Sequence, residues 1–203
     1  MNTHEAIFSR RSIRVFKDQP IEREKIIRYL EAANAAPSAG NNQPWLFYVI
    51  KKNTIDKLKD IIESSLTERK DYNTQDFRAR LDKMSVPEIE GDKLKGMKAF
   101  FRSLGNAPVA IIVTVEANID PWKDFINTQD AAAAIQNLIL SAWDDGVGSC
   151  WMCGPLHKSI NIKEALRLPE KQKLIAIIPL GYPETIPPAP PKKDTSEKTI
   201  WID

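Results

Sequence analysis

The sequence has few of the features that mark disulfide-rich, nucleic-acid-binding or membrane proteins. Only 2 of its 203 residues are cysteine, which excludes a disulfide framework. Its 29 basic residues are nearly balanced by 27 acidic ones that interleave with them, so a nucleic-acid footprint is not expected. The apolar segment 108–115 has only the length of a strand, and the polar first residues are unlike a signal peptide. We therefore expect a cytoplasmic protein with neither a nucleic acid nor a membrane as partner.

The chain does contain enough apolar residues for one substantial core. With 42% hydrophobic residues over 203 positions, we expect a single domain spanning residues 1–203. The apolar runs 109–115 and 174–180 do not alternate with polar residues, so both faces of these strands should be covered. The pattern predicts an α/β protein whose central sheet is sandwiched by helices. Strands are predicted at 46–50, 109–115, 147–152 and 174–180, and helices at 2–8, 22–36, 54–66, 75–84, 93–104, 128–143 and 159–166.

A short arginine-rich segment near the start of the chain has the chemistry of an anion site. If it is extended, Arg10, Ser12 and Arg14 point to one face. Ile13 and Val15 then point to the other face and anchor in a core. Guanidinium forks and a hydroxyl suit a phosphate. The doubled arginine leaves the register open, so Arg11 is an alternative ligand, and a solvated helix end is an equally good interpretation of the segment.

The loop 37–45 is a second candidate binding segment. It follows the predicted helix 22–36, which Pro37 ends, and it is rich in small residues and amides. Such side chains suit the uracil-like edge and ribityl chain of a flavin, although an ordinary Asn- and Gly-rich turn has the same composition. Together with the arginine segment, the loop suggests flavin mononucleotide (FMN). Its candidate ring contacts are Pro37, Ser38, Ala39, Asn41 and Gln43.

Cys150 and Cys153 form a C-x-x-C pair, which raises a thiol–disulfide or metal-binding hypothesis. A thioredoxin-type pair is expected just after a strand near the start of a domain, whereas this pair is late and is followed by Gly154. A zinc site with His157 lacks a fourth ligand, because the only other histidine is His4. We expect no metal site and interpret the cysteines as small residues beside the flavin.

The last part of the chain is an extended tail. Several prolines from Pro183 onward prevent regular packing, yet the tail ends in Ile200, Trp201 and Ile202, which are costly to leave in water. We expect the tail to lie on another surface. The alternative is a flexible terminus without a docking site.

Read in order, these motifs resemble the nitroreductase family of flavin enzymes. The resemblance rests on RRSIR near the start, APSAGNNQPW after the first long helix, and DAAAAIQNLIL followed by GVGSCWMCG. It continues through AIIPLGYPE and the proline-rich basic tail. Only the region 66–105 lacks a recognisable signature.

The resemblance implies an α+β nitroreductase fold with a mixed, mainly antiparallel sheet, in an intertwined homodimer whose C-terminal tails are exchanged. It implies that a tail lysine, Lys192 or Lys193, reaches the FMN phosphate and that the loop 37–43 contacts the ring from the other subunit. The backbone N–H of Cys153 or Gly154 would face the flavin N5, although some members carry Glu-Gly at this place. The region 66–105 would cover the substrate channel, and a solvated surface excursion is the alternative.

The function implied by the resemblance is an FMN-dependent oxidoreductase that uses NADH or NADPH. It would reduce a nitroaromatic, a quinone or a related small acceptor by a ping-pong cycle. The flavin carries the chemistry, so no catalytic side chain is required, and Arg14 would stabilise negative charge at the flavin N1/O2 edge. The alternatives are a dehalogenating or flavin-fragmenting activity on the same fold, a non-catalytic flavin-binding protein, and a thiol–disulfide protein.

Overall fold

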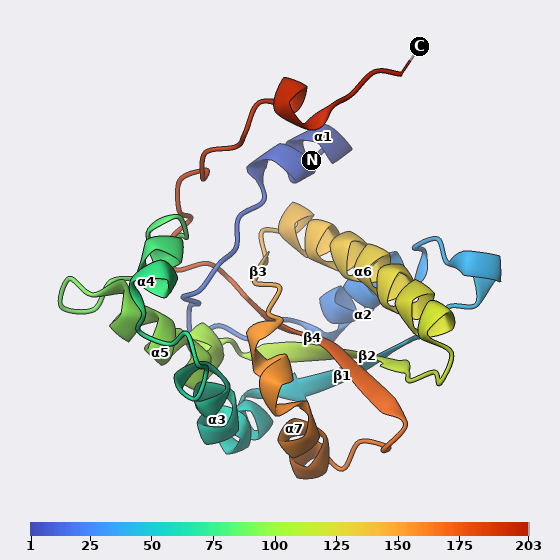
Figure 1. The fold of residues 1–203 in the computed structure, drawn as a ribbon, viewed down its shortest axis with the longest axis horizontal. Helices are drawn as coiled ribbons and strands as arrows, with labels where there is room; N and C mark the ends of the chain where they lie inside the picture. Colours follow the sequence, from blue (N-terminus) through green and yellow to red (C-terminus); the bar gives the residue numbers. More distant parts are fainter. Residues whose placement is uncertain (203) are drawn as a thin grey trace.

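A four-stranded antiparallel sheet lies at the centre of the computed structural model, which describes residues 1–202 (Figure 1). The strand order is β1–β2–β4–β3, and each neighbouring pair is antiparallel. A register shift between Val113 and Thr114 interrupts the β2–β4 pairing. The strands are β1 (Trp45–Lys51), β2 (Val109–Glu116), β3 (Gly148–Ser149) and β4 (Gln172–Gly181).

Both faces of the sheet are covered by helices, as the apolar strands predicted. Because side chains alternate along β2, Ile112 packs into one core cluster and Ile111 into the other. The Ile112 cluster includes buried residues of α3 (Lys52–Thr67), α5 (Lys93–Ser103) and α7 (Ser159–Leu166). The Ile111 cluster includes those of α2 (Arg23–Asn34) and α6 (Pro121–Asp144). The sandwich and the two-sided burial of β2 are therefore confirmed.

The longest helix, α6, begins seven residues before its predicted start at 128. The side chain of Asp120 accepts a hydrogen bond from the Trp122 N–H, and Pro121 occupies the first turn, where a missing N–H costs nothing. The prediction missed these turns because Trp122 and Phe125 are exposed and break the apolar pattern. The pair Asp120-Pro121 is the signal in the sequence that marks the start of this helix.

Other differences lie at element ends. The predicted strand 147–152 shortens to β3, and Met152 pairs with Ile177 only as an isolated bridge. The predicted helix 22–36 ends at Asn34, consistent with the restricted backbone of a residue that precedes proline. Helices α1 (Thr3–Ser9) and α4 (Gln75–Asp82) lie within two residues of their predictions. No helix among residues 1–202 has the length and apolar character needed to cross a bilayer.

The segment 66–105 packs onto the body of the protein. Phe77 and Leu81 of α4 join Phe100 and Phe101 of α5 in the core that α3 contributes to. The alternative of a solvated surface excursion is therefore wrong. A function as substrate cover stays a prediction.

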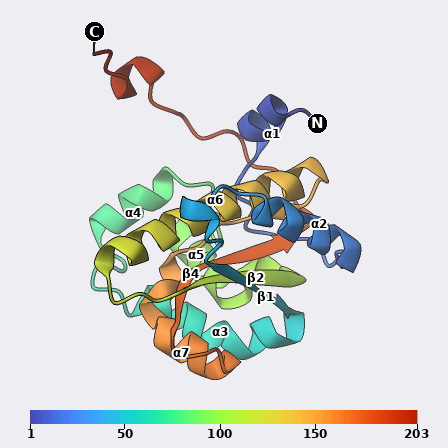
Figure 2. The ribbon, with the colours of Figure 1, turned by 90° about the vertical axis from the view of Figure 1, so that its right-hand side faces the viewer.

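The tail leaves the body of the protein (Figures 1 and 2). Beyond Pro183, its regular structure is a short turn of helix, η4 (Thr195–Lys198). Trp201 is 86% exposed, and Ile200 and Ile202 beside it are equally open to solvent. An apolar end in water lacks the stabilisation that a docking surface supplies.

Candidate functional site

The arginine segment is extended and tied to the sheet at Ser12. Ser12 pairs with Ser149 in a parallel bridge, and the Ile13 N–H donates to the Ser149 carbonyl at 2.9 Å. Ile13 is 1% exposed and lies against Gly148, where a Cβ would stand 2.5 Å from its Cγ1. Only glycine at position 148 permits this approach. The predicted anchor Ile13 is confirmed.

The prediction that Val15 is a second anchor in the core is wrong. It is 37% exposed, and Phe16 is buried in its place. The Phe16 N–H donates to the Gly105 carbonyl at 2.9 Å, and Phe16 forms an isolated bridge with Pro183. Two isolated bridges in place of a continuous strand do not maintain the two-residue alternation, so the prediction fails after Arg14.

Four residues of the arginine segment and one tail lysine line a common cavity of about 590 Å³. They are Arg10, Arg11, Ser12, Arg14 and Lys192. Arg10 is half-buried, and this burial lowers the pKa of its guanidinium. Arg10 also caps the end of α1, so the segment does begin at a helix end, but its guanidinium is only partly exposed to water. The cavity supplies the cations that a phosphate requires.

The structure distinguishes between the alternative phosphate ligands, Arg10 or Arg11 in the arginine segment and Lys192 or Lys193 in the tail. Arg11 already donates from Nη1 to the carbonyls of Phe8 at 2.8 Å and of Arg10 at 2.9 Å, at the end of α1. Arg10 is therefore the better candidate. Of the two tail lysines, Lys192 is among the cavity's lining residues and Lys193 is not.

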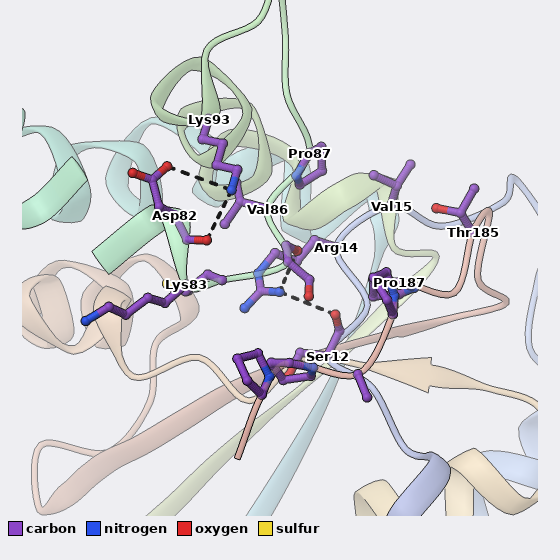
Figure 3. Close-up of a pocket in the computed structure, with 16 residues that line it drawn as sticks. Ser12, Arg14, Val15, Asp82, Lys83, Val86, Pro87, Lys93, Thr185 and Pro187 are labelled. Atoms are coloured by element: carbon purple, nitrogen blue, oxygen red, sulfur yellow. Dashed lines mark hydrogen bonds and ion pairs between the residues drawn. The ribbon is translucent and has the colours of Figure 1, made fainter. Parts of the chain in front are cut away.

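Arg14 lies where this cavity meets two others. Its Nη1 donates to the Ser85 carbonyl at 2.9 Å and, more weakly, to the Ser12 carbonyl at 3.3 Å (Figure 3). Its Nε is buried and has no hydrogen-bond partner within residues 1–202. Such a donor carries a desolvation cost that a bound acceptor would remove. The residues present therefore fit a polar ligand beside Arg14.

The cavity in Figure 3 is lined by a lysine that the sequence analysis did not predict as a site residue. Lys83, from the segment that follows α4, lines this cavity and also the cavity of Arg10 and Lys192. Lys93 also lines the cavity in Figure 3, but its Nζ is 3.8 Å from Asp82 Oδ1, and this carboxylate partly neutralises its charge. No motif in the region 66–105 could have indicated Lys83, because its proximity to Ser12 depends on how α4 packs.

A second, smaller cavity begins at Arg14 and includes the predicted Cys153–Gly154 peptide. Its volume is about 270 Å³, and its apolar lining includes Phe77, Phe100 and Phe101. A Cβ on Gly154 would lie 2.7 Å from Phe101 Cζ, so a larger residue at 154 would displace the end of this ring. The structure thus brings Arg14, Cys153 and Gly154 together at one cavity, as a flavin ring beside that cavity would require.

The two thiols do not have the surroundings of reactive cysteines. Cys150 is buried and Cys153 is exposed. Burial raises the pKa of the Cys150 thiol. Cys153 is exposed as a residue, but neighbouring atoms partly desolvate its thiol and raise its pKa as well, so the nucleophilic thiolate is disfavoured at both positions. Among residues 1–202, no cluster of three or more His, Cys, Asp or Glu side chains is placed to hold a metal ion.

The loop 37–43 contacts α6. Its short helix η1 (Ala39–Asn41) places the Ala39 N–H 3.2 Å from Asp130 Oδ2, and Gln43 donates its N–H to Ser38 Oγ at 3.0 Å. Asn41 and Gln43 both have positive φ, a conformation that asparagine tolerates better than most residues and glutamine does not. Pro37, Ala39, Asn41 and Gln43 are exposed. The loop therefore offers its polar groups to solvent or to another chain.

Within one chain, this loop and the arginine segment lie apart. Asp130 holds the loop near the first half of α6, whereas Trp143, at its other end, donates from Nε1 to Ser9 Oγ at 2.8 Å, next to Arg10. Thirteen residues of helix separate Asp130 from Trp143, or about 20 Å. Figure 1 shows the loop and the arginine segment at opposite ends of α6.

Comparison with known proteins places these residues in a family. A model of the nitroreductase family matches residues 7–182. The chain belongs to the nitroreductase family. A relative from Archaeoglobus fulgidus, provisionally named NADH dehydrogenase/NAD(P)H nitroreductase, is 32% identical over 180 residues, or 88% of this chain and 83% of the relative.

Two further relatives extend the comparison. Iodotyrosine deiodinase 1 of Rattus norvegicus is 27% identical over 97% of this chain and 66% of its own length. A solved structure from Desulfovibrio desulfuricans, provisionally described as a nitroreductase in complex with FMN, is 25% identical with a TM-score of 0.69. The match covers 100% of this chain and 98% of that one. The predicted nitroreductase fold is confirmed.

Proposed function

We propose that this nitroreductase-family protein is an FMN-dependent oxidoreductase that takes electrons from NADH or NADPH. The observation that carries the proposal is Arg14, whose buried Nε has no partner within residues 1–202. Its guanidinium lies between two cavities: the cationic cavity, lined by Arg10 and Lys192, and the aromatic cavity, lined by Phe77, Phe100 and Phe101. A flavin enzyme needs both environments, because the phosphate is anionic and the acceptor needs an apolar space beside the flat flavin ring. Membership of the family supports the same reading.

The phosphate is held by the residues of the cationic cavity. Arg10 and Ser12 bind it from the extended segment, and Lys192 binds it from the tail. The half-buried guanidinium of Arg10 is less hydrated than a surface arginine, so each charge-assisted hydrogen bond contributes about 1.5 to 3 kcal/mol.

The ring lies beside Arg14 and the Cys153–Gly154 peptide. Bound FMN would supply the hydride and electron chemistry between the nicotinamide and the acceptor, which we expect to follow a ping-pong cycle. Arg14 stabilises the negative charge that develops at the N1/O2 edge, and a backbone N–H of Cys153 or Gly154 donates toward N5. The apolar cavity excludes water around these groups.

The complete site is formed by two chains. The separation of about 20 Å along α6 supports this, because one chain holds its loop 37–43 far from its own arginines. In a two-fold dimer whose α6 helices run antiparallel, each loop meets the arginine end of the partner chain. Pro37, Ser38, Ala39, Asn41 and Gln43 then contact the ring, and the apolar tail end docks on the partner.

The acceptor is a nitroaromatic, a quinone or a related small molecule. With a nitro compound, the nitro group, two electrons and two protons give a nitroso group and water. A second candidate is reductive dehalogenation, favoured by the match to iodotyrosine deiodinase over 97% of this chain.

The visible spectrum of the purified protein tests the proposal. We expect a yellow protein that loses its colour when NADH or NADPH is added without oxygen, and regains it with a nitroaromatic or quinone. Colour that does not bleach would indicate a flavin-binding protein without turnover. A colourless protein that also fails to bind added FMN would overturn the proposal and leave the thiol–disulfide hypothesis.

A further inference from the structure

The outer part of the aromatic cavity contains a cluster of charged residues that the proposed function does not use. Arg69, in the turn after α3, and Arg80, on α4, line the cavity together with Arg14. Within residues 1–202, no Asp or Glu is among its lining residues. All of its charged lining groups are therefore cations.

One carboxylate, Asp71, organises two of these arginines. Arg69 donates from Nε to Asp71 Oδ1 at 2.8 Å and from Nη2 to Oδ2 at 2.9 Å, which is a bidentate pair. Arg80 donates from Nη2 to the same Oδ2. Both guanidinium groups also lie over the ring of Phe77, each 5.5 Å from its centre. The pair is thus held in place on an aromatic surface.

Asp71 does not cancel the positive charge of the pair. Two guanidinium groups against one carboxylate leave a net charge of +1, apart from Arg14. Nε and Nη1 of Arg80 have no hydrogen-bond partner within residues 1–202, and the Arg80 side chain is 56% exposed. Arg80 therefore has free donors with which to bind a second anion.

The remaining lining restricts the shape of the ligand. A volume of about 270 Å³ lies at the small end of ligand pockets, which suits one aromatic ring rather than a fused system. Phe77, Phe100 and Phe101 contribute aromatic atoms to the lining, and an aromatic ligand packs favourably against such atoms. The Cys153–Gly154 peptide lines the same cavity, so a ligand there lies close to the proposed position of the flavin.

We propose that the acceptor reduced by this protein is a single-ring aromatic molecule that carries an anionic substituent beside its reducible nitro or quinone group, as a nitrobenzoate does. The reducible group takes up the two electrons and two protons, and the anionic substituent binds Arg80 and Arg69. This inference rests on the proposed function, because the acceptor must lie beside a bound flavin. Arg80 is then a specificity-determining residue, and Asp71 is a positioning residue that orients both guanidinium groups.

Binding of a non-reducible ligand to the oxidised holoprotein tests the inference. Benzoate and benzamide have the same size, and only benzoate is charged, so the change in the flavin spectrum reports their affinities directly. We expect benzoate to bind about tenfold more tightly. Arg80→Gln should remove most of this preference, whereas Arg80→Lys should keep part of it. Arg78→Gln is the matched control, because Arg78 is on the same helix but pairs with Asn73 and Asp92.

Steady-state rates give a second readout. The ratio of kcat/KM for 4-nitrobenzoate to that for 4-nitrobenzamide should fall about tenfold in Arg80→Gln and stay unchanged in Arg78→Gln. Equal affinity for benzoate and benzamide in the unmodified protein would overturn the inference. So would a double Arg69→Gln, Arg80→Gln variant that keeps the preference for benzoate.

Two other outcomes separate this inference from the proposed function. If the variants change the NADPH to NADH ratio but not the benzoate preference, the arginines bind the donor's extra phosphate and the inference is wrong. A protein whose flavin bleaches with NADPH but which does not bind benzoate also overturns the inference, with the proposed function intact. A protein that binds no flavin refutes both.

Discussion

Two of the three cavities that meet at Arg14 differ in composition and in how the chain builds them. The larger one contains Arg10, Ser12 and Lys192, which come from the two ends of the chain. The smaller one contains Phe77, Phe100 and Phe101, all from the segment 66–105, beside the Cys153–Gly154 peptide. We infer that the ends of the chain bind the anionic part of the cofactor, whereas the helical segment shapes the space for the acceptor.

Deleting residues 187–203 should have the largest effect, because it removes Lys192 and Pro190 from the cationic cavity and several prolines from the neighbouring cavity shown in Figure 3. We expect FMN affinity to fall by about a hundredfold or more and the dimer to dissociate, since cofactor and subunit contacts stabilise the same state. Light scattering and flavin titration of the truncated chain measure both. A dimer with full FMN affinity would show that the tail has no binding function.

Arg10→Ala and Arg14→Ala should each weaken FMN binding roughly tenfold to a hundredfold, through loss of charge-assisted hydrogen bonds. Riboflavin lacks the phosphate, so its affinity distinguishes contacts with the ring from contacts with the phosphate. Riboflavin affinity should be unchanged in Arg10→Ala and reduced in Arg14→Ala. If both variants lose FMN and riboflavin equally, the division between a phosphate site at Arg10 and a ring contact at Arg14 is wrong.

Lys83→Gln should have a smaller effect of about twofold to fivefold on FMN affinity, because Lys83 is exposed and solvent weakens its attraction to phosphate. Riboflavin binding should not change. Lys59→Gln, on the exposed face of α3, is the control. A loss of riboflavin affinity in Lys83→Gln would indicate that the segment after α4 contacts the ring.

The double variant Cys150→Ala, Cys153→Ser should have the smallest effect. Burial raises the pKa of both thiols, so they are protonated near neutral pH and are poor nucleophiles. Bleaching by NADH or NADPH and steady-state turnover should remain close to those of the unmodified protein. A variant that binds FMN normally yet has no turnover would instead show that the cysteines take part in the reaction.

Much of the fold was predictable because its signals are local. Strands β2 and β4 are continuous apolar runs, and such runs predict burial on both faces. The start of α6 was missed because exposed aromatic residues hide the apolar pattern of its first turns. Val15 was misplaced because alternation holds only in a regular strand, and this segment is held by isolated bridges.

The amino-acid sequence by itself determined which groups are available: arginines and a hydroxyl near one end, lysines near the other, amides in the loop 37–43, and glycines at 148 and 154. Only the tertiary structure decided which of them meet. Arg14 donates to Ser85, which is 71 residues away, and Ala39 donates to Asp130, which is 91 residues away. The position of Arg80 on the aromatic cavity likewise depends on how α4 packs against α5. Local patterns encode secondary structure and chemistry, whereas contacts between distant segments arise only when the core forms.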